Sequence, residues 1–415
     1  MCDYITKDKT IIFSPYFNEE IEVGLLDKYS NVIFSDCELN EDSFECYKNK
    51  DLKYIGSKFN QQVNLPQNLT KLIFGNNFNQ PVDLLPNKLK YLKFGEKFNY
   101  PIYALPCSLE VLILGKNFNH PINNIPNSIK ELVLGESFDQ KLLILPTNLK
   151  CLDLGKIYSK VVKNFPPNIE KFIMSDRYNF TINNLPDTIR YIKFGKCFKK
   201  NIKSLPNKIE EIRFNSRFNN QVLKYPDNLK KLIFGSSYNQ EPKNLNDVLE
   251  ILAFGTCFNC PVNNLPSSIK ILHFGNSFNC PINNLPTNIE EIYFGSCFNC
   301  AVDYLPSSIK ILHFGHHFSQ SVDNLPSSIE EIYFGSCFNC PIDNLPYSVK
   351  KIRFIGKYSI PILNLPDSLN CIETYERLEK NIIPNKYRKL IKKIIKTKCF
   401  FEKYISYNKF VNINL

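Results

Sequence analysis

Residues 265–284 read LPSSIKILHFGNSFNCPINN, and this stretch decides the fold because versions of it recur every 20 residues. An aromatic residue stays in phase from Phe78 to Tyr358, and a glycine precedes it by three residues in most copies. A proline keeps the same phase at positions 66, 86, 106, 126, 146, 166, 186, 206, 226, 266, 286, 306, 326, 346 and 366. Three columns in register are the signature of a solenoid, in which each short unit packs only against its neighbours.

Within one unit, the residues predict a strand, a turn and a return. Residues 271–274 suit a short strand that points Leu272 and Phe274 to one side and His273 to the other. Gly275 permits either a positive φ or a close backbone approach. Pro286 favours an extended, polyproline-like return path. Twenty residues leave no room for a helix in each unit, so stacked units predict one parallel sheet with strands about 4.8 Å apart.

Stacking turns the repeated positions into ladders along the solenoid. One column predicts a shared aromatic spine, and the next predicts an asparagine ladder that satisfies turn backbone groups. A third column alternates in charge, which fixes the register of the rungs because a slip of one rung would oppose like charges. These columns are Phe258, Phe278, Phe298, Phe318 and Phe338; Asn259, Asn279, Asn299 and Asn339; and Glu250, Lys270, Glu290, Lys310, Glu330 and Lys350.

Composition fits a folded chain whose charge is unevenly placed. Of 415 residues, 43% are hydrophobic, and the net charge is +11. Residues 371–415 hold nine Lys and two Arg against four Glu, so this segment is basic and the remainder is nearly neutral. Neither a secretory leader nor a run of about eighteen apolar residues is visible. With 15 Cys, an odd number, we expect an intracellular (cytoplasmic) protein with reduced thiols.

The two ends look like caps on the repeats. Residues 13–21 align with residues 74–82, and residues 31–37 resemble another unit, which predicts decayed rungs near the N-terminus. After Pro384, residues 385–396 show the spacing of an amphipathic helix that would close the open end of the core. We therefore expect three parts: residues 1–51 as degenerate capping rungs, residues 52–370 as the solenoid, and residues 371–415 as a basic, helical cap.

The motif at residues 278–282, FNCPI, together with the Leu-Pro and Phe-Gly columns, resembles the FNIP repeat family. That family is related to leucine-rich repeats and occurs chiefly in social amoebae and their large DNA viruses. The resemblance covers residues 52–370 and implies a β-rich, leucine-rich-repeat-like solenoid. With the periodicity, it predicts a right-handed stack of about 17–18 short rungs with one long parallel sheet and a C-terminal helical cap.

Some members of the family carry an F-box ahead of the repeats, which implies a role as substrate receptors of ubiquitin ligases. The first fifty residues here show decayed rungs and no helical F-box pattern. The family implies no catalytic residues. An adaptor for host ubiquitin-ligase components stays open as an alternative.

The outward strand positions are the candidate surface for a protein partner, since Tyr and Arg are typical of binding hot spots. This column consists of His273, Tyr293, His313, Tyr333 and Arg353. The competing interpretation is a solvated strand face that echoes an internal duplication of residues 267–300 in residues 307–340. The main functional prediction is a non-enzymatic protein-interaction scaffold that acts through this exposed face.

The basic segment offers another candidate surface, for nucleic acid or an anionic membrane. It consists of Lys386, Arg388, Lys389, Lys392, Lys393, Lys396 and Lys398. The solvated face of a capping helix is the favoured interpretation, so a nucleic-acid or membrane partner is the less favoured alternative.

Three pairs of cysteines have the two-residue spacing of zinc sites and suggest a metal site: Cys257 and Cys260, Cys297 and Cys300, and Cys337 and Cys340. The repeat itself supplies that spacing, although Cys280 and Cys300 would lie about 4.8 Å apart in stacked rungs. Small thiols without a metal are the favoured interpretation. None of the five histidines shows an identifiable nucleophile or paired carboxylate, so we expect no enzyme activity, metal, cofactor or small-molecule substrate.

Overall fold

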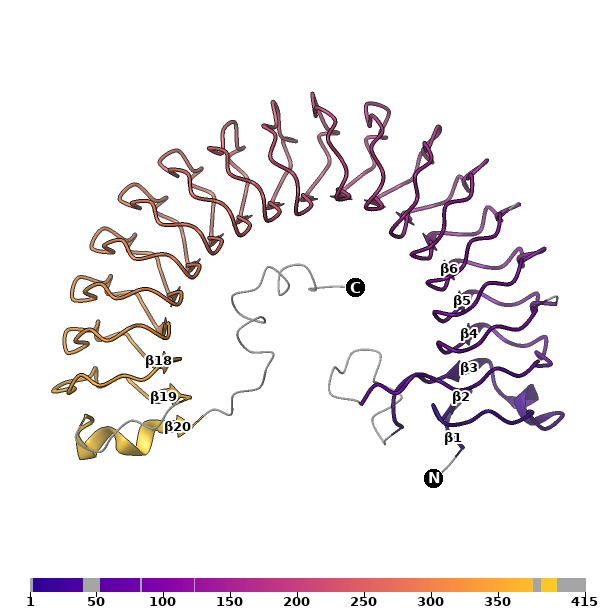
Figure 1. The fold of residues 1–415 in the computed structure, drawn as a ribbon, viewed down its shortest axis with the longest axis horizontal. Helices are drawn as coiled ribbons and strands as arrows, with labels where there is room; N and C mark the ends of the chain where they lie inside the picture. Colours follow the sequence, from indigo (N-terminus) through magenta and orange to yellow (C-terminus); the bar gives the residue numbers. More distant parts are fainter. Residues whose placement is uncertain (1–2, 40–52, 83, 123, 376–381, 394–415) are drawn as a thin grey trace. The chain divides into compact units, whose positions relative to one another are not determined.

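The computed structural model describes residues 3–39, 53–82, 84–122, 124–375 and 382–393. The chain forms two compact units, Met1–Lys200 (unit 1) and Asn201–Leu415 (unit 2). Within the described residues, the fold is a β-solenoid of about 18 stacked turns, as the 20-residue repeat predicts. Each turn carries one short strand on one side and returns through irregular backbone on the other (Figure 1).

Unit 1 contains a mostly parallel sheet. Strand β1 pairs antiparallel with β2, and each following strand pairs in parallel with the next. The elements are β1 Tyr4–Lys7, β2 Thr10–Phe13, the 3-10 helix η1 Leu25–Lys28, β3 Asn31–Phe34, β4 Lys71–Ile73, β5 Tyr91–Lys93, β6 Val111–Ile113, β7 Glu131–Val133, β8 Cys151–Asp153, β9 Lys171–Ile173 and β10 Tyr191–Lys193.

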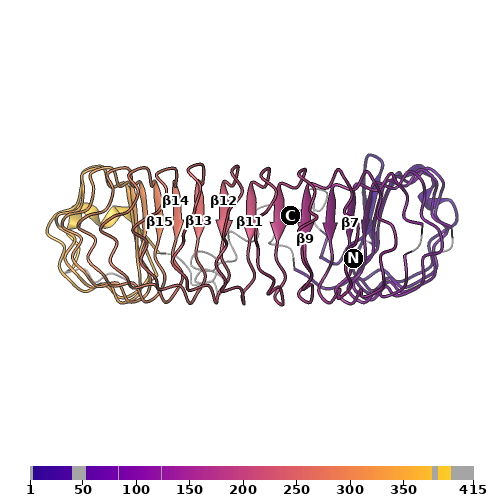
Figure 2. The same ribbon diagram turned by 90° about the horizontal axis from the view of Figure 1, so that it is seen from above.

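Unit 2 contains a parallel sheet in which consecutive strands run side by side, as β11 to β15 show in Figure 2. The elements are β11 Glu211–Arg213, β12 Lys231–Ile233, β13 Ile251–Ala253, β14 Ile271–His273, β15 Glu291–Tyr293, β16 Ile311–His313, β17 Glu331–Phe334, β18 Lys351–Phe354, β19 Cys371–Thr374, the 3-10 helix η3 Asn385–Leu390 and β20 Ile391–Lys393.

One rung shows why these residues form a strand. In β14, Leu272 is fully buried and Phe274, just beyond the strand, is 5% exposed, while His273 is only half-buried on the other face. The register places Leu272 opposite Ile292 and His273 opposite Tyr293, so residues 20 apart are direct neighbours. The predicted alternation of the strand and the predicted columns are therefore confirmed.

Gly275 is explained by a close backbone approach and not by a positive φ. A Cβ atom at Gly275 would lie 1.7 Å from the carbonyl oxygen of Gly255 in the preceding rung. That oxygen belongs to the backbone and cannot swing away, so the column needs glycine where rungs meet this closely. Of the two alternatives that the sequence leaves open, the close approach is correct.

The return path contains turns in place of one continuous extended segment. The carbonyl of Pro266 accepts a hydrogen bond from the Ile269 amide at 3.3 Å, and Pro306 and Ile309 repeat this bond. A proline lacks an amide donor but keeps its carbonyl, so the repeated proline opens a turn that leads into the next strand. The predicted polyproline-like return is wrong at this point.

The aromatic spine is continuous through the middle of unit 2. Phe278, Phe298 and Phe318 are fully buried, and successive ring centroids lie 6.0 and 6.1 Å apart. A second column supports the spine, since the ring of Phe294 stacks 3.8 Å from Phe298. Burying one such ring stabilises the fold by about 1.5–3 kcal/mol, so the spine contributes a large apolar term that neighbouring rungs share.

The asparagine ladder works through backbone amides. Asn259 Oδ1 accepts a hydrogen bond from the Asn279 amide at 2.9 Å, and Asn279 Oδ1 accepts one from the Asn299 amide at the same distance. The charge column pairs as its alternation predicts. Salt bridges join Lys270 to Glu250, Lys310 to Glu290 and Lys350 to Glu330 at 3.4, 2.8 and 2.8 Å.

The N-terminal rungs occur where the sequence places them. Strands β2 and β3 pair in parallel, with Phe13 opposite Phe34, and β3 pairs with β4. Strand β1 is not predicted by the sequence; it covers the free edge of β2 by antiparallel pairing. Its Ile5 packs with Leu39 against Ile12, Ile33 and Ile73, so the chain itself covers this part of the sheet face.

The C-terminal end differs from the prediction of one amphipathic helix over residues 385–396. Of the described residues 385–393, Asn385–Leu390 is helical, as η3, and Ile391–Lys393 forms β20 beside β19. The free edge of a parallel sheet presents unpaired backbone groups, and β20 satisfies them better than a continuing helix would. Tyr387 anchors η3, because its hydroxyl donates to the Leu365 carbonyl at 2.9 Å and accepts from the Leu365 amide at 3.1 Å.

Residues 394–396 of the predicted helix lie outside the described residues. Across the part of the chain that the structure describes, no helix has the length and apolar character needed to cross a bilayer. The boundaries of the three predicted parts, at residues 51 and 370, stay a prediction.

Candidate functional site

Four rings stack along the outward face of β14 to β17, where the sequence predicts a partner surface. His273 lies 3.9 Å from Tyr293, Tyr293 lies 4.4 Å from His313, and His313 lies 3.8 Å from Tyr333, measured between ring centroids. The planes are within 20° of parallel. Arg353 ends the stack with its guanidinium 4.9 Å from the centroid of Tyr333. We call these five residues the sheet-face ladder.

Carboxylates orient the phenols of the sheet-face ladder. The Tyr293 hydroxyl donates to Glu291 Oε2 at 2.7 Å, and the Tyr333 hydroxyl donates to Glu331 in the same way. Burial raises the pKa of Tyr333, and the hydrogen bond to Glu331 adds to this effect. Each phenol is thus a donor held to a carboxylate two residues earlier on the same strand.

An ion pair closes the C-terminal end of the sheet-face ladder. Arg353 Nε donates to Glu373 Oε2 at 2.6 Å, and Lys351 Nζ lies 3.1 Å from Glu373 Oε1. Burial alone would raise the pKa of Glu373, but hydrogen bonds from Arg353 and Lys351 outweigh it and hold that pKa below its ordinary value. Glu373 is thus the ionised partner of two cations.

The structure corrects the expectation that the whole column is exposed. Tyr333 and Arg353 are each only 8% exposed, whereas His273, Tyr293 and His313 are half-buried. The stacked ring of His313, the bond to Glu331 and the pair with Glu373 account for much of this burial. The accessible part of the sheet-face ladder is therefore His273, Tyr293 and His313.

The basic segment divides into described and undescribed residues. Lys386, Arg388 and Lys389 are exposed on η3, and Lys392 is exposed on β20. Lys386 Nζ also lies 4.5 Å from the centroid of the buried Tyr387 ring. Lys393 belongs to β20, and Lys396 and Lys398 lie outside the described residues. These contacts fit the predicted solvated face of a cap, while a nucleic-acid or membrane role stays a prediction.

The cysteine column at Cys260, Cys280 and Cys300 holds protonated thiols. Burial raises the pKa of all three, and for Cys260 and Cys280 the neighbouring thiol adds to the effect. Each sulfur also lies within hydrogen-bond distance of an asparagine Oδ1; Cys280 Sγ, for example, is 3.4 Å from Asn259 Oδ1. Because metals bind thiolates, these features disfavour metal binding in this column.

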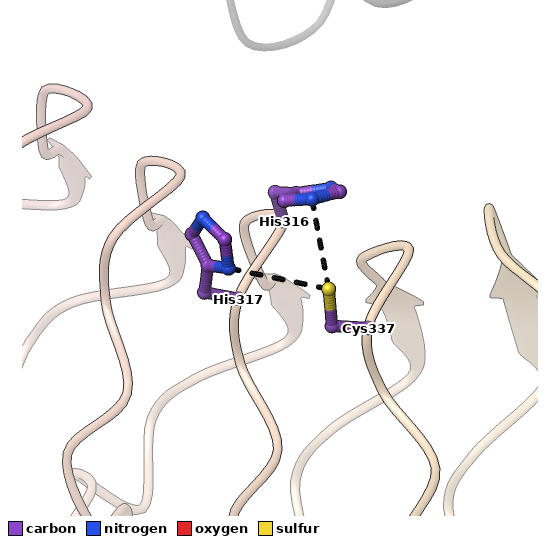
Figure 3. A group of neighbouring side chains, drawn as sticks. All are labelled: His316, His317 and Cys337. Atoms are coloured by element: carbon purple, nitrogen blue, oxygen red, sulfur yellow. Dashed lines mark hydrogen bonds between the residues drawn. The ribbon is translucent and has the colours of Figure 1, made fainter.

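A different set of residues has metal-binding geometry, and the sequence analysis missed it. Cys337 Sγ lies 3.6 Å from His316 Nε2 and 4.0 Å from His317 Nδ1 (Figure 3). Among the described residues, these three form the one group of at least three metal-ligand side chains whose donor atoms all lie within 4.8 Å. The signal in the sequence is local: the two histidines replace the Asn276-Ser277 pair of the duplicated segment.

An apolar groove of about 710 Å³ lies on the return side of unit 1, between the rungs at residues 141–147 and 159–167. Leu143 and Ile144 at its rim are 68% and 84% exposed. The repeat pattern does not predict this groove, because most other rungs have polar residues at the positions of Leu143 and Ile144.

Among solved structures, the chain is similar to CroV588, described as a novel circular LRR protein, with 27% identity and a TM-score of 0.69. The match covers 92% of this chain and 69% of that one. YopM from Yersinia enterocolitica matches with 17% identity and a TM-score of 0.41, over 72% of this chain and 76% of that one. The fold and the first of these likenesses define a leucine-rich-repeat-like solenoid.

The family follows from the repeat itself. The family model described as FNIP Repeat matches residues 59–97, 78–117, 118–156, 160–197, 258–297, 298–337 and 318–357. These segments cover more than half of the 415 residues, so the chain belongs to the FNIP repeat family. None of the curated proteins shows a significant match to this sequence.

Proposed function

We propose that this protein is a non-enzymatic scaffold that binds a partner protein on the strand face of unit 2. Solenoids of the leucine-rich-repeat class commonly mediate protein–protein interaction, because stacked rungs present an extended surface of side chains. The observation that supports this face is the stack of His273, Tyr293 and His313, with centroid separations of 3.9 and 4.4 Å. Aromatic rings that are half-buried and already ordered suit the centre of an interface.

The physical advantage of this surface is preorganisation. Binding ordinarily costs about 0.5–1.5 kcal/mol for each flexible side chain that is immobilised. Here stacking and the bond from Tyr293 to Glu291 restrict the rings before a partner arrives. Carboxylates of Glu291 and Glu331 beside the rings favour a partner that offers cationic or hydrogen-bond-donor groups around an apolar centre.

Catalysis finds little support at this face. The imidazoles of His273 and His313 stack against phenols, and those phenols already donate to Glu291 and Glu331. This arrangement does not form the hydrogen-bonded chain of nucleophile, base and orienting group that nucleophilic catalysis uses. We also infer an intracellular location, since eleven of the described cysteines, a set that leaves out Cys37, are free thiols.

The test compares two triple variants in quantitative affinity capture, followed by direct binding of the captured protein in purified form. The first variant, H273S/Y293S/H313S, removes the accessible rings of the sheet-face ladder. The matched control, Y304S/Y347S/L363S, removes three large side chains that are 72%, 78% and 77% exposed outside the strands. Circular dichroism checks that both variants keep the fold of the intact chain.

The proposal predicts that a purified partner binds the intact chain and the control with equal affinity. It predicts at least a tenfold weaker affinity for the ladder variant, since hot-spot residues cost 1–2 kcal/mol or more on truncation. Equal binding to all three folded proteins would refute the assignment of this face. Loss of binding only on charge reversal at Lys389 and Lys392 would move the interaction to the basic segment.

A further inference from the structure

Two neighbouring turns of unit 2 bring three metal-ligand side chains together. His316 and His317 follow β16, and Cys337 occupies the same repeat position as His317 one rung later. Figure 3 shows the two imidazoles and the thiol directed toward one another from these turns. His316 is half-buried, while His317 and Cys337 are exposed, so an ion from solvent can reach all three.

We propose that His316, His317 and Cys337 bind one Zn²⁺ ion. Zinc binds Cys sulfur at about 2.3 Å and His nitrogen at about 2.0–2.1 Å in tetrahedral geometry, which sets a sulfur–nitrogen separation of about 3.6 Å. The observed separations from Cys337 Sγ are 3.6 Å to His316 Nε2 and 4.0 Å to His317 Nδ1. All three donor atoms lie within 4.8 Å of one another, so small side-chain rotations complete the site without moving the backbone.

The backbone of both turns is held in place by the solenoid. The Cys337 amide donates to the His316 carbonyl at 2.9 Å, and the His317 amide donates to the Ser296 carbonyl at 2.9 Å. The rung spacing that produces these backbone hydrogen bonds also fixes the distance between the side chains of His316, His317 and Cys337. The site is thus preorganised by the same stacking that builds the fold.

The repeat motif by itself does not require His316, His317 and Cys337, because other rungs have different residues at these positions. In the same column, Cys257 has Ser237 and Ser277 in the rungs on either side, so it has no imidazole neighbour in that column. Residues 267–300 and 307–340 are nearly identical, yet Asn276 and Ser277 are replaced by His316 and His317. His317 stands between Cys297 and Cys337 in this column, and the short contacts of both histidines are with Cys337.

The donor set identifies the class of metal. Two imidazoles and one thiolate suit zinc and disfavour Ca²⁺ and Mg²⁺, which prefer oxygen ligands. Three protein ligands leave one coordination position for water or for a donor from another protein. Bound zinc would also link two rungs at turns outside the strands, independently of the sheet-face ladder.

The experiment adds Co²⁺ alone, as a spectroscopic substitute for zinc, to the full chain purified without metal and kept reduced. A thiolate-to-cobalt charge-transfer band reports cysteine ligation, and loss of the band on adding Zn²⁺ reports displacement. Titration calorimetry with Zn²⁺ gives the stoichiometry. The variants are C337S, and H316N/H317S, which restores the residues of the matching rung. The control is C257S, which removes an exposed cysteine at the same repeat position.

We expect the intact chain and C257S to bind one Co²⁺ with the band and to lose the band with one equivalent of Zn²⁺. C337S should lose the band, and H316N/H317S should bind Zn²⁺ at least about a hundredfold more weakly, since even outer partners of zinc ligands contribute 10–100-fold. An undiminished band in folded C337S, or no Zn²⁺ bound by the intact chain, would overturn the proposal.

Discussion

The spine makes its strongest prediction at Phe298, which lies in the middle of unit 2. Its side chain is fully buried and contacts rings on three sides: Phe278 at 6.0 Å, Phe318 at 6.1 Å and Phe294 at 3.8 Å between centroids. Phe298→Ala removes the ring and leaves a cavity between two rungs. Buried Phe→Ala changes cost about 3–5 kcal/mol, and the stacked neighbours leave little room for collapse, so we expect the upper half of this range.

The appropriate assay is native-state hydrogen exchange of the full chain, because a long repeat array need not unfold in one step. Each 1.4 kcal/mol is a factor of ten in the opening equilibrium, so a cost of about 4–5 kcal/mol should make amides near β15 exchange roughly 700- to 4,000-fold faster. Rungs contact only their neighbours, so the effect should fade toward β11. The control is Tyr304→Ala, whose side chain is 72% exposed and should change exchange little.

Two results would refute this reasoning about the spine. One is a change in local stability below about 1 kcal/mol, which would mean that the ring is not closely packed. The other is equal acceleration throughout unit 2, which would mean that the rungs unfold as one block and that nearest-neighbour stacking is not the unit of stability.

Three further predictions concern the ladders of unit 2. Lys310→Met should lower the melting temperature at low salt but not at high salt. Hydrogen bonds and charge from Lys310 and Lys350 hold the pKa of Glu290 and Glu330 below the ordinary value, so the stability that these pairs contribute is present above the unfolded-state pKa and is lost as pH falls through the folded-state pKa. The melting temperature of the variant should therefore depend less on acid pH than that of the intact chain. Asn279→Ala should cost about 1 kcal/mol in chemical denaturation by removing the acceptor of the Asn299 amide, whereas Asn279→Asp should cost less, because Asp139 accepts from the Ser159 amide at 2.7 Å in the same way; equal costs would contradict the ladder's role. Cys280 and Cys300, whose pKa is raised by burial, should alkylate more slowly at pH 7–8 than the exposed Cys257, as measured by mass spectrometry, and equal rates would mean that their thiols are not shielded.

Most of the fold could be predicted from the sequence because its information is periodic. A residue such as Leu272 has the same environment as Leu252 and Ile292, so a pattern repeated every 20 residues defines strand, core and register together. The bond from Asn279 to the next rung and the salt bridge of Lys310 with Glu290 follow from the same stacking. Each depends only on nearest neighbours, which the repeat specifies.

The features that the sequence did not predict depend on contacts outside the repeat. Strand β1 and strand β20 form at the sheet edges, where unpaired backbone groups and not periodicity decide the structure. Tyr333 and Arg353 are buried through Glu331, which lies two residues before Tyr333 on the same strand, and Glu373, where an acid replaces the aromatic and basic residues of the column. The group at His316, His317 and Cys337 arises from two departures from the motif, which an analysis of shared columns does not detect.

The central claim, that the strand face of unit 2 binds a partner protein, is tested most directly by site-specific photo-crosslinking. A photoreactive residue is placed at His313, half-buried on β16, and separately at Tyr304, which is 72% exposed outside the strands. The proposed function predicts that the purified partner crosslinks efficiently from position 313 and only weakly from position 304. Efficient crosslinking from position 304 with none from position 313, while the partner is bound, would contradict it.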